Sequence, residues 1–204
     1  MKAPTKRAWQ RMLSGRRLDL IEPSPLDVEI DDIAHGLSRV ARWNGQTRGE
    51  DIYSVAQHSL LVEALFAASA AAPTPDQRLI ALLHDSPEFV IGDMISPFKA
   101  AIGDQYRAVE ERLLHAVHLR FALPARVEPA LKKAIKAADR AAAYFEATTL
   151  AGFAAPEAIG FFGAPSVAVE AFARYLTPWR PVEAQRRFLE RFAALDQARG
   201  DRRH

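Results

Sequence analysis

From about Asp32 onward, apolar residues recur every three or four positions, which is the spacing of one face of an α-helix. No segment shows the alternation of apolar and polar residues that is typical of a strand or a hairpin. We therefore expect an all-α fold, built as a single helical bundle. The predicted helices cover residues 32–43, 54–72, 75–85, 104–121, 126–152 and 181–198, with a short one near 165–176.

Two of these helices have clear starting signals. Ser54 can cap the helix that follows it, and Thr74 with Gln77 forms the pattern of a capping box. Pro87 disfavours a helical conformation at the residue before it, so the second of these helices should end near residue 85. The His-Asp pair at 84–85 is therefore expected at a helix C-terminus that opens onto a loop.

The first part of the chain lacks this helical period, and Pro23 and Pro25 would interrupt a helix there. We expect an irregular N-terminal leader over residues 1–31, followed by one domain over residues 32–204 that ends in a C-terminal helix. A length of 204 residues suits such an organisation. The residues that carry the candidate site fall within 34–153.

Composition excludes several kinds of site. The chain has no cysteine, which rules out disulfides, thiolate metal sites and a cysteine nucleophile. Any protein metal ligands must then be His, Asp or Glu. The formal net charge is only +2, with many basic residues near the two ends, so we expect solvated ends and no nucleic-acid polymer as partner.

The sequence gives no sign of a membrane segment. No apolar run approaches the roughly 18 residues that a spanning helix needs. The N-terminal residues are basic but have no apolar stretch of the kind found in a secretory signal. The expected location is therefore the cytoplasm.

Polar residues interrupt apolar helical faces at three places: His58 in SVAQHSLLV, His84 and Asp85 in ALLHDSPE, and Asp139 in IKAADRAAAYFEA. Each interruption alone is a weak signal, since a single buried histidine is usually structural. A carboxylate in a core costs several kcal/mol unless it is paired or bound to a metal. All three interruptions become favourable if the side chains converge on one cation. This mixed nitrogen and oxygen set suits Mn²⁺, Fe²⁺, Co²⁺, Ni²⁺ or Zn²⁺ better than Ca²⁺.

The order H…HD…D resembles the HD superfamily of metal-dependent phosphohydrolases, and within it the bacterial 5′-deoxynucleotidase (YfbR-like) family. The segment HDSPEFVIGDMISPFK is similar to that family's HD-x-x-E-x-x-x-G-D-x-x-[ST]-P-x-K pattern, and KAADRAAAYFEA resembles its K-x-A-D-x-x-x-A-Y segment. Arg42 and Trp43 also stand before His58, the first histidine of this order, as an Arg-Trp pair does in that family. The resemblance covers about residues 34–153. It implies an HD domain that removes the 5′-phosphate from deoxyribonucleoside 5′-monophosphates with one divalent transition metal ion, and it implies a homodimer.

The resemblance also implies a role for each matching residue. The metal ligands would be His58, His84, Asp85 and Asp139. As catalytic residues, Glu88 would activate the attacking water or protonate the leaving 5′-oxygen, and Asp93 would bind the sugar 3′-hydroxyl. Trp43 would pack near the sugar and disfavour ribonucleotides. The phosphate would be held by Arg42, Ser96 and Lys99.

Three alternatives remain open. Dinuclear relatives carry additional histidines where His115 and His118 lie, but His115 falls opposite the apolar stripe of its helix, which favours one metal. Alarmone hydrolases resemble H-D-x-x-E-D, whereas Phe89 stands here where the last Asp would be. The third alternative is a non-catalytic HD module that senses a nucleotide. The buried carboxylates argue against it, because a scaffold need not keep them.

Overall fold

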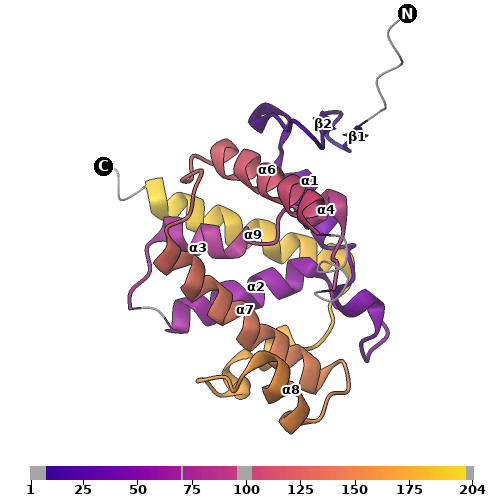
Figure 1. Cartoon of the computed structure of the whole chain (residues 1–204), viewed down its shortest axis with the longest axis vertical. Coiled ribbons are helices and arrows are strands. Elements are labelled where there is room, and N and C mark those ends of the chain that lie inside the picture. The colour runs from indigo at the N-terminus through magenta and orange to yellow at the C-terminus, as the bar shows by residue number, and fades with distance from the viewer. Residues whose placement is uncertain (1–7, 70, 96–102, 201–204) are drawn as a thin grey trace, which may run out of the picture.

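The computed structural model describes residues 8–69, 71–95 and 103–200, and these ranges are mostly helical (Figure 1). The all-α prediction is confirmed. The α-helices are α1 (Ile30–Leu37), α2 (Val55–Ser69), α3 (Pro75–Leu82), α4 (Glu88–Ile91), α6 (Asp104–Arg120), α7 (Pro129–Thr149), α8 (Ala155–Phe162) and α9 (Pro181–Gly200). Shorter 3-10 helices are η1 (Pro25–Asp27), η2 (Arg42–Gly45) and η3 (Val169–Tyr175).

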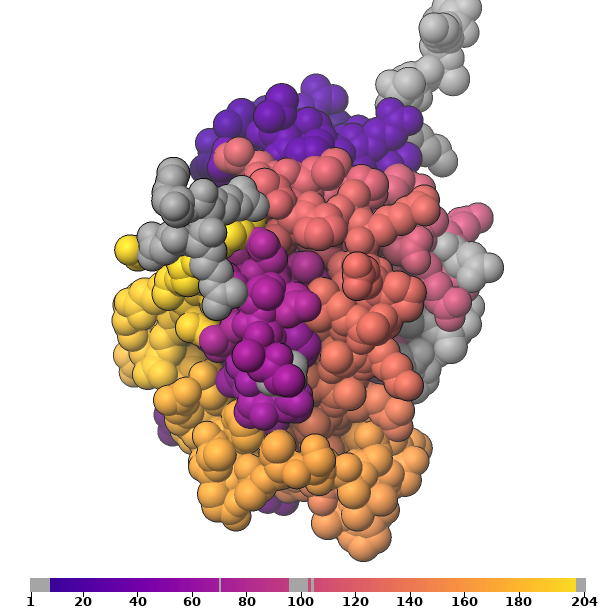
Figure 2. All heavy atoms as spheres, turned by 90° about the vertical axis from the view of Figure 1, so that its left-hand side faces the viewer, coloured from indigo at the N-terminus to yellow at the C-terminus, as the bar shows by residue number. Residues whose placement is uncertain are grey.

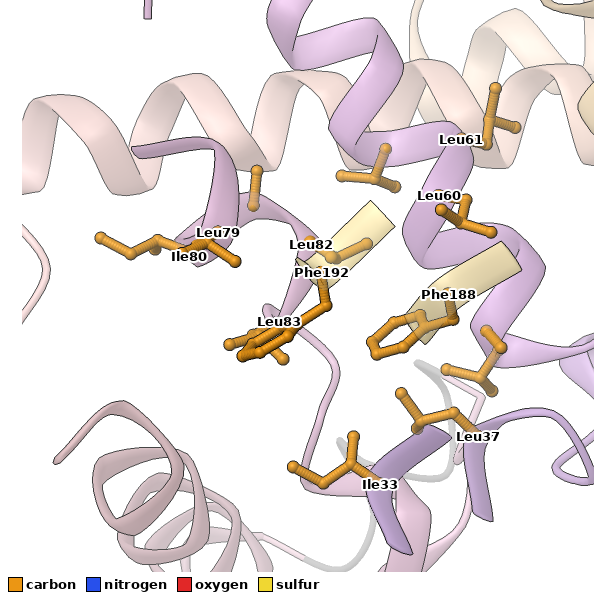
Figure 3. Packing of buried hydrophobic residues seen from close by; sticks show 14 of the residues in the cluster. Ile33, Leu37, Leu60, Leu61, Leu79, Ile80, Leu82, Leu83, Phe188 and Phe192 are labelled. Atoms are coloured by element: carbon orange, nitrogen blue, oxygen red, sulfur yellow. The ribbon is translucent and has the colours of Figure 1, made fainter. Parts of the chain in front are cut away.

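Helix α2 lies in the middle of the bundle and packs against α3, α7, α9 and η3. Its first nine residues are all buried, and it is apolar on most sides, as expected for a helix enclosed by others. Figure 3 shows the core where α1, α2, α3 and α9 meet. The side chains labelled there are Ile33, Leu37, Leu60, Leu61, Leu79, Ile80, Leu82, Leu83, Phe188 and Phe192.

The predicted helix starts are confirmed. The Ser54 hydroxyl accepts a hydrogen bond from the backbone N–H of Gln57 at the start of α2 (3.3 Å). Thr74 and Gln77 form a reciprocal capping box at the start of α3. Helix α3 ends at Leu82, slightly earlier than expected, and the chain turns before α4 begins. The His-Asp pair at 84–85 therefore lies in this turn, just beyond a helix end.

The prediction that the chain contains no hairpin is wrong. Within the expected irregular leader, β1 (Trp9–Arg11) pairs antiparallel with β2 (Arg17–Asp19). The buried side chain of Leu18 anchors the hairpin to the core, and the Ser14 amide and hydroxyl in its turn both donate to Asp32. Strands of three residues are too short to show an alternating pattern. The boundary between residues 31 and 32 remains a prediction.

Two other segments differ from the prediction. The helix expected over 32–43 ends at Leu37, because the backbone near Val40 then pairs with residues 53–55 instead of continuing the helix. Helix α8 was not predicted, since residues 151–168 contain one charged side chain and show no amphipathic period. The segment expected as a short helix near 165–176 forms η3.

The ends of the molecule are built by different parts of the chain. Figure 2 shows the N-terminal segment covering one end and the region of α8 at the opposite end. The N-terminal segment is held to α6 by Arg120, whose guanidinium donates to the Val28 carbonyl (2.8 Å) and to Glu29 (2.9 Å). In the part of the chain that the structure describes, no helix has the length and apolar character to cross a membrane.

A buried carboxylate joins three helices of the core. Glu63 of α2 is 2% exposed and accepts hydrogen bonds from Arg78 of α3 (2.6 Å) and from Arg191 of α9 (2.8 and 2.9 Å). The two guanidinium groups remain partly exposed, so water still solvates them. This arrangement keeps the carboxylate satisfied without fully burying the two positive charges.

Glu63→Gln should lower the free energy of unfolding by about 1–2 kcal/mol, because hydrogen bonds between charged groups become bonds to a neutral amide. Urea unfolding followed by circular dichroism measures the change. The matched control is Glu190→Gln, which breaks an exposed pair with Arg186 and should cost under roughly 0.5 kcal/mol. Equal losses in the two variants would contradict the assignment of Glu63 as a core residue.

Candidate metal centre

The structure brings the four predicted metal ligands together from three elements. His58 lies in the first turn of α2, Asp139 lies midway along α7, and His84 and Asp85 lie in the turn after α3. His58, His84 and Asp139 each offer a ligand atom, and these atoms lie within 4.8 Å of one another. Asp85 Oδ2 lies 3.3 Å from His58 Nε2 and 3.2 Å from His84 Nε2. Side chains from three separate places in the sequence therefore face one small volume.

The two imidazoles are oriented as metal ligands usually are. His58 Nδ1 lies 2.5 Å from Glu146 Oε1, and His84 Nδ1 lies 2.9 Å from the Ala81 carbonyl oxygen. Among the described residues, neither buried Nε2 atom has a hydrogen-bond partner, although carboxylate oxygens lie near both. A metal-bound histidine typically donates its other N–H to a carboxylate or a carbonyl. These residues therefore fit a divalent ion bound through both Nε2 atoms.

The carboxylates of the cluster are held in their ionised form. Burial alone would raise the pKa of Asp85, but the neighbouring imidazoles of His84 and His58 bring this pKa well below its usual range. The pKa of Asp139 is also lowered against the effect of burial, chiefly by the nearby imidazole of His58, whose Nε2 lies 3.4 Å from Asp139 Oδ1. Lys136 holds the second oxygen of Asp139 at 2.6 Å. Ionised oxygens in this position can bind a cation.

The pKa of His58 is raised well above its usual value. Burial and the charge of Arg42 act to lower this pKa, but the carboxylates of Glu146, Asp139 and Asp85 outweigh them. The three carboxylates thus favour a positive charge at this point. A divalent cation would satisfy the same preference.

Glu146 is a residue of the site that the sequence analysis missed. It lies on α7 and is fully buried, with Oε1 facing His58 Nδ1. Its other oxygen, Oε2, accepts from Trp43 Nε1 (2.9 Å) and from Arg42 Nη2 (3.4 Å). The available signal was a charged residue seven positions after Asp139, which places both on the same face of the helix.

The Arg-Trp pair lies on a strained turn beside the cluster. Trp43 (φ 56°) and Asn44 (φ 50°) in η2 both have the left-handed backbone conformation, which residues other than glycine rarely adopt. The Trp43 ring packs against Phe153 and Phe162, with centroid distances of 5.6 and 5.9 Å. Such strain persists only when the surrounding contacts fix it, and it is often found at functional sites.

Asp93 also accepts a hydrogen bond from Arg42, the residue that donates to Glu146. It follows α4, and its Oδ2 accepts from Arg42 Nη1 at 3.1 Å. Glu88 is the first residue of α4 and is buried. Burial would lower the pKa of Arg42, but the charges of Glu146, Asp93, Asp85 and Glu88 raise it above its usual value, so this guanidinium stays positive. Arg42 thus lies within electrostatic reach of the predicted catalytic residues.

The remaining predicted residues fall elsewhere. Ser96 and Lys99, predicted to hold the phosphate, lie outside the described residues. His115 is exposed, and the Nδ1 of buried His118 lies 2.9 Å from the Pro124 carbonyl oxygen. Within residues 8–69, 71–95 and 103–200, neither histidine belongs to a group of side chains that could hold a metal.

An all-α bundle that gathers side chains in the order H…HD…D agrees with the resemblance to the HD superfamily. Residues 32–152 match the model of the 5′-deoxynucleotidase YfbR-like family. The chain therefore belongs to this family of hydrolases, and the resemblance is confirmed. It is also similar to an uncharacterised protein of Rhodobacter capsulatus, with 56% identity over 191 residues, which is 93% of this chain and 96% of that protein.

Elemental analysis of the purified protein should find about one transition-metal ion per chain, because the four predicted ligands lie close together. His84→Ala and Asp139→Ala should each lose most of this metal. The matched control is His115→Ala, which removes an exposed histidine and should keep wild-type metal content. Full occupancy in both ligand variants would refute the assigned metal centre.

Proposed function

We propose that this protein is a metal-dependent phosphohydrolase that converts deoxyribonucleoside 5′-monophosphates and water into deoxyribonucleosides and phosphate. The supporting observation is that one hydrogen-bonded network contains both the ligand cluster and a guanidinium group that can bind phosphate. The network runs from His58 through Glu146 to Arg42, and on to Asp93. Membership of the 5′-deoxynucleotidase YfbR-like family supports the same reaction.

The cluster would hold one divalent transition metal through His58, His84, Asp85 and Asp139. When bound, such an ion supplies Lewis acidity: it stabilises negative charge on phosphoryl oxygens and lowers the pKa of a water molecule. Arg42 adds a permanent positive charge, and the remaining N–H groups of its guanidinium suit a phosphate oxygen. Charges fixed in advance around a phosphoryl group are the main source of catalysis in phosphate transfer.

Glu88 would act as the general base or general acid of the reaction. The water oxygen attacks phosphorus, the bond from phosphorus to the 5′-oxygen breaks, and the leaving alkoxide needs a proton. A buried carboxylate three residues after Asp85 suits the proton transfer from water or to the leaving oxygen. Since Glu88 is not among the proposed ligands, its substitution separates chemistry from metal binding.

Asp93 and Trp43 would contact the sugar and select deoxyribose. Asp93 receives Arg42 on one carboxylate oxygen, so the other oxygen can accept from a 3′-hydroxyl. Trp43 is held on one side by Glu146 and on the other by Phe153 and Phe162. An indole fixed in this way cannot easily move aside for a 2′-hydroxyl. Steric exclusion of one hydroxyl gives discrimination of moderate size rather than absolute selection.

The wild type should hydrolyse dAMP about 10–100-fold better than AMP, as kcat/KM, and should be much less active on 3′-dAMP. Phosphate release from a nucleotide panel measures this. Trp43→Ala should bring the dAMP to AMP ratio toward one, while the control Trp179→Ala, whose ring packs near Tyr175 and Arg187, should not change it. Equal turnover of AMP and dAMP, or turnover of alarmones or cyclic dinucleotides alone, would refute the substrate. Nucleotide binding without any turnover would favour a sensing module.

Glu88→Gln should lower kcat for dAMP by roughly 10²–10⁴, the usual loss when a general acid or base is removed. Metal content and dAMP binding should persist, because the substitution is nearly isosteric. Steady-state kinetics and elemental analysis on the same preparation check both expectations. Glu157→Gln, an exposed position on α8, serves as the control. A kcat within a few-fold of wild type would mean that Glu88 has only a structural role.

A further inference from the structure

Glu146 is surrounded by hydrogen-bond donors from two different parts of the site. The Trp43 indole and the Arg42 guanidinium can only donate, and both donate to Oε2. His58 Nδ1 faces Oε1. If His58 Nε2 is a ligand to a cation, the proton of the neutral ring must be on Nδ1, so this nitrogen also becomes a donor. A carboxylate is the side chain that can accept on both sides at once.

We propose that Glu146 is a positioning residue that couples the proposed metal ligand His58 to Arg42 and Trp43, the two residues proposed to contact the substrate. One oxygen fixes the ring orientation and tautomer of His58. The other oxygen holds the indole and the guanidinium at a set position relative to that ring. This inference rests on the proposed function, because it assigns the sugar-reading role to Trp43.

An amide cannot replace this carboxylate. A glutamine at position 146 has one acceptor oxygen and one NH₂ donor. Its oxygen would turn toward Trp43 and Arg42, because two donors, one of them charged, lie on that side. The NH₂ group would then face His58 Nδ1 and favour the proton on Nε2, where it competes with the metal. Glu146→Gln should therefore weaken metal binding while it leaves the sugar-reading side largely intact.

The backbone of η2 gives Glu146 a second function in the same site. Trp43 and Asn44 occupy the left-handed region, a conformation that costs free energy and needs external contacts. The indole hydrogen bond to Glu146 is one such contact, and ring packing against Phe153 and Phe162 provides the others. A side chain at position 146 without an acceptor would remove the partner of His58 Nδ1, Trp43 Nε1 and Arg42 Nη2. Both the metal affinity and the dAMP to AMP ratio should then decrease.

The decisive experiment compares two substitutions with different hydrogen-bonding capacity. The full chain loaded with Co²⁺ is titrated with a chelator, and the concentration that removes half the metal gives the relative affinity. Glu146→Gln should lower the affinity about 10–100-fold, the usual loss when a partner of a ligand histidine is removed, and keep the dAMP to AMP ratio. Glu146→Met, which keeps the volume but has no carboxylate or amide, should lower both.

Glu63→Gln is the matched control. Glu63 is buried to a similar degree and is also bound by arginines, but its partners lie on α3 and α9 away from the ligand cluster. This variant should lose stability while metal affinity and the dAMP to AMP ratio stay at wild-type values. A decrease of metal affinity in Glu63→Gln equal to that in Glu146→Gln would show a general effect of lost stability and overturn the inference.

Two further results would overturn it: wild-type metal affinity in Glu146→Gln, or a wild-type dAMP to AMP ratio in a folded Glu146→Met. If the methionine variant does not fold, the nearly isosteric glutamine variant still decides the metal side. Chelator titration needs no substrate, so it remains informative if the wild type hydrolyses no deoxynucleotide. In that case the proposed function fails while the coupling of Glu146 to His58 is judged separately.

Discussion

The site depends on a contact between two fully buried ionisable side chains, His58 of α2 and Glu146 of α7, which lie 88 positions apart in the sequence. Burying either charge without the other would cost several kcal/mol, so the pair favours the packing of these two helices in one register. The contact also occupies His58 Nδ1 and leaves Nε2 facing Asp85 and Asp139. One interaction therefore sets both how two central helices pack and where the proposed metal ligand His58 points.

The residue before His58 is equally constrained. Gln57 is buried, its amide donates to the carbonyls of Tyr175 and Thr177, and its oxygen accepts from the Trp179 amide. Three hydrogen bonds from one side chain tie the first turn of α2 to the chain that leads into α9. Because α2 is also enclosed by other helices, His58 has little freedom to reorient. Ligands held by rigid elements and hydrogen-bonded neighbours need little rearrangement to bind an ion.

The features that depend on local spacing could be predicted from the sequence. The features that depend on contacts between distant residues could not. Helical period and capping residues such as Thr74 predicted most helices. The polar interruptions at His58, at the His-Asp pair 84–85 and at Asp139, together with the family resemblance, predicted which side chains would meet. Ring orientation, by contrast, depends on Glu146, whose partners His58, Arg42 and Trp43 come from two separate segments, α2 and η2. The hairpin around Leu18 was missed because tertiary burial, and not strand length, stabilises it. The conformation of Trp43 follows from packing that no local pattern encodes.

The strained turn at Trp43 shows how stability and specificity conflict in this site. A left-handed conformation at such a residue costs about 1–3 kcal/mol, and glycine would remove most of that cost. Glycine would also remove the indole, and with it both the hydrogen bond to Glu146 and the packing against Phe153 and Phe162. These contacts offset the strain and hold the ring in place. A ring fixed in this way can discriminate by size, because a substrate group that overlaps it cannot be accommodated by a small shift. In the proposed function, the carboxylate of Glu146 that orients His58 thus also fixes the ring of Trp43 beside the substrate.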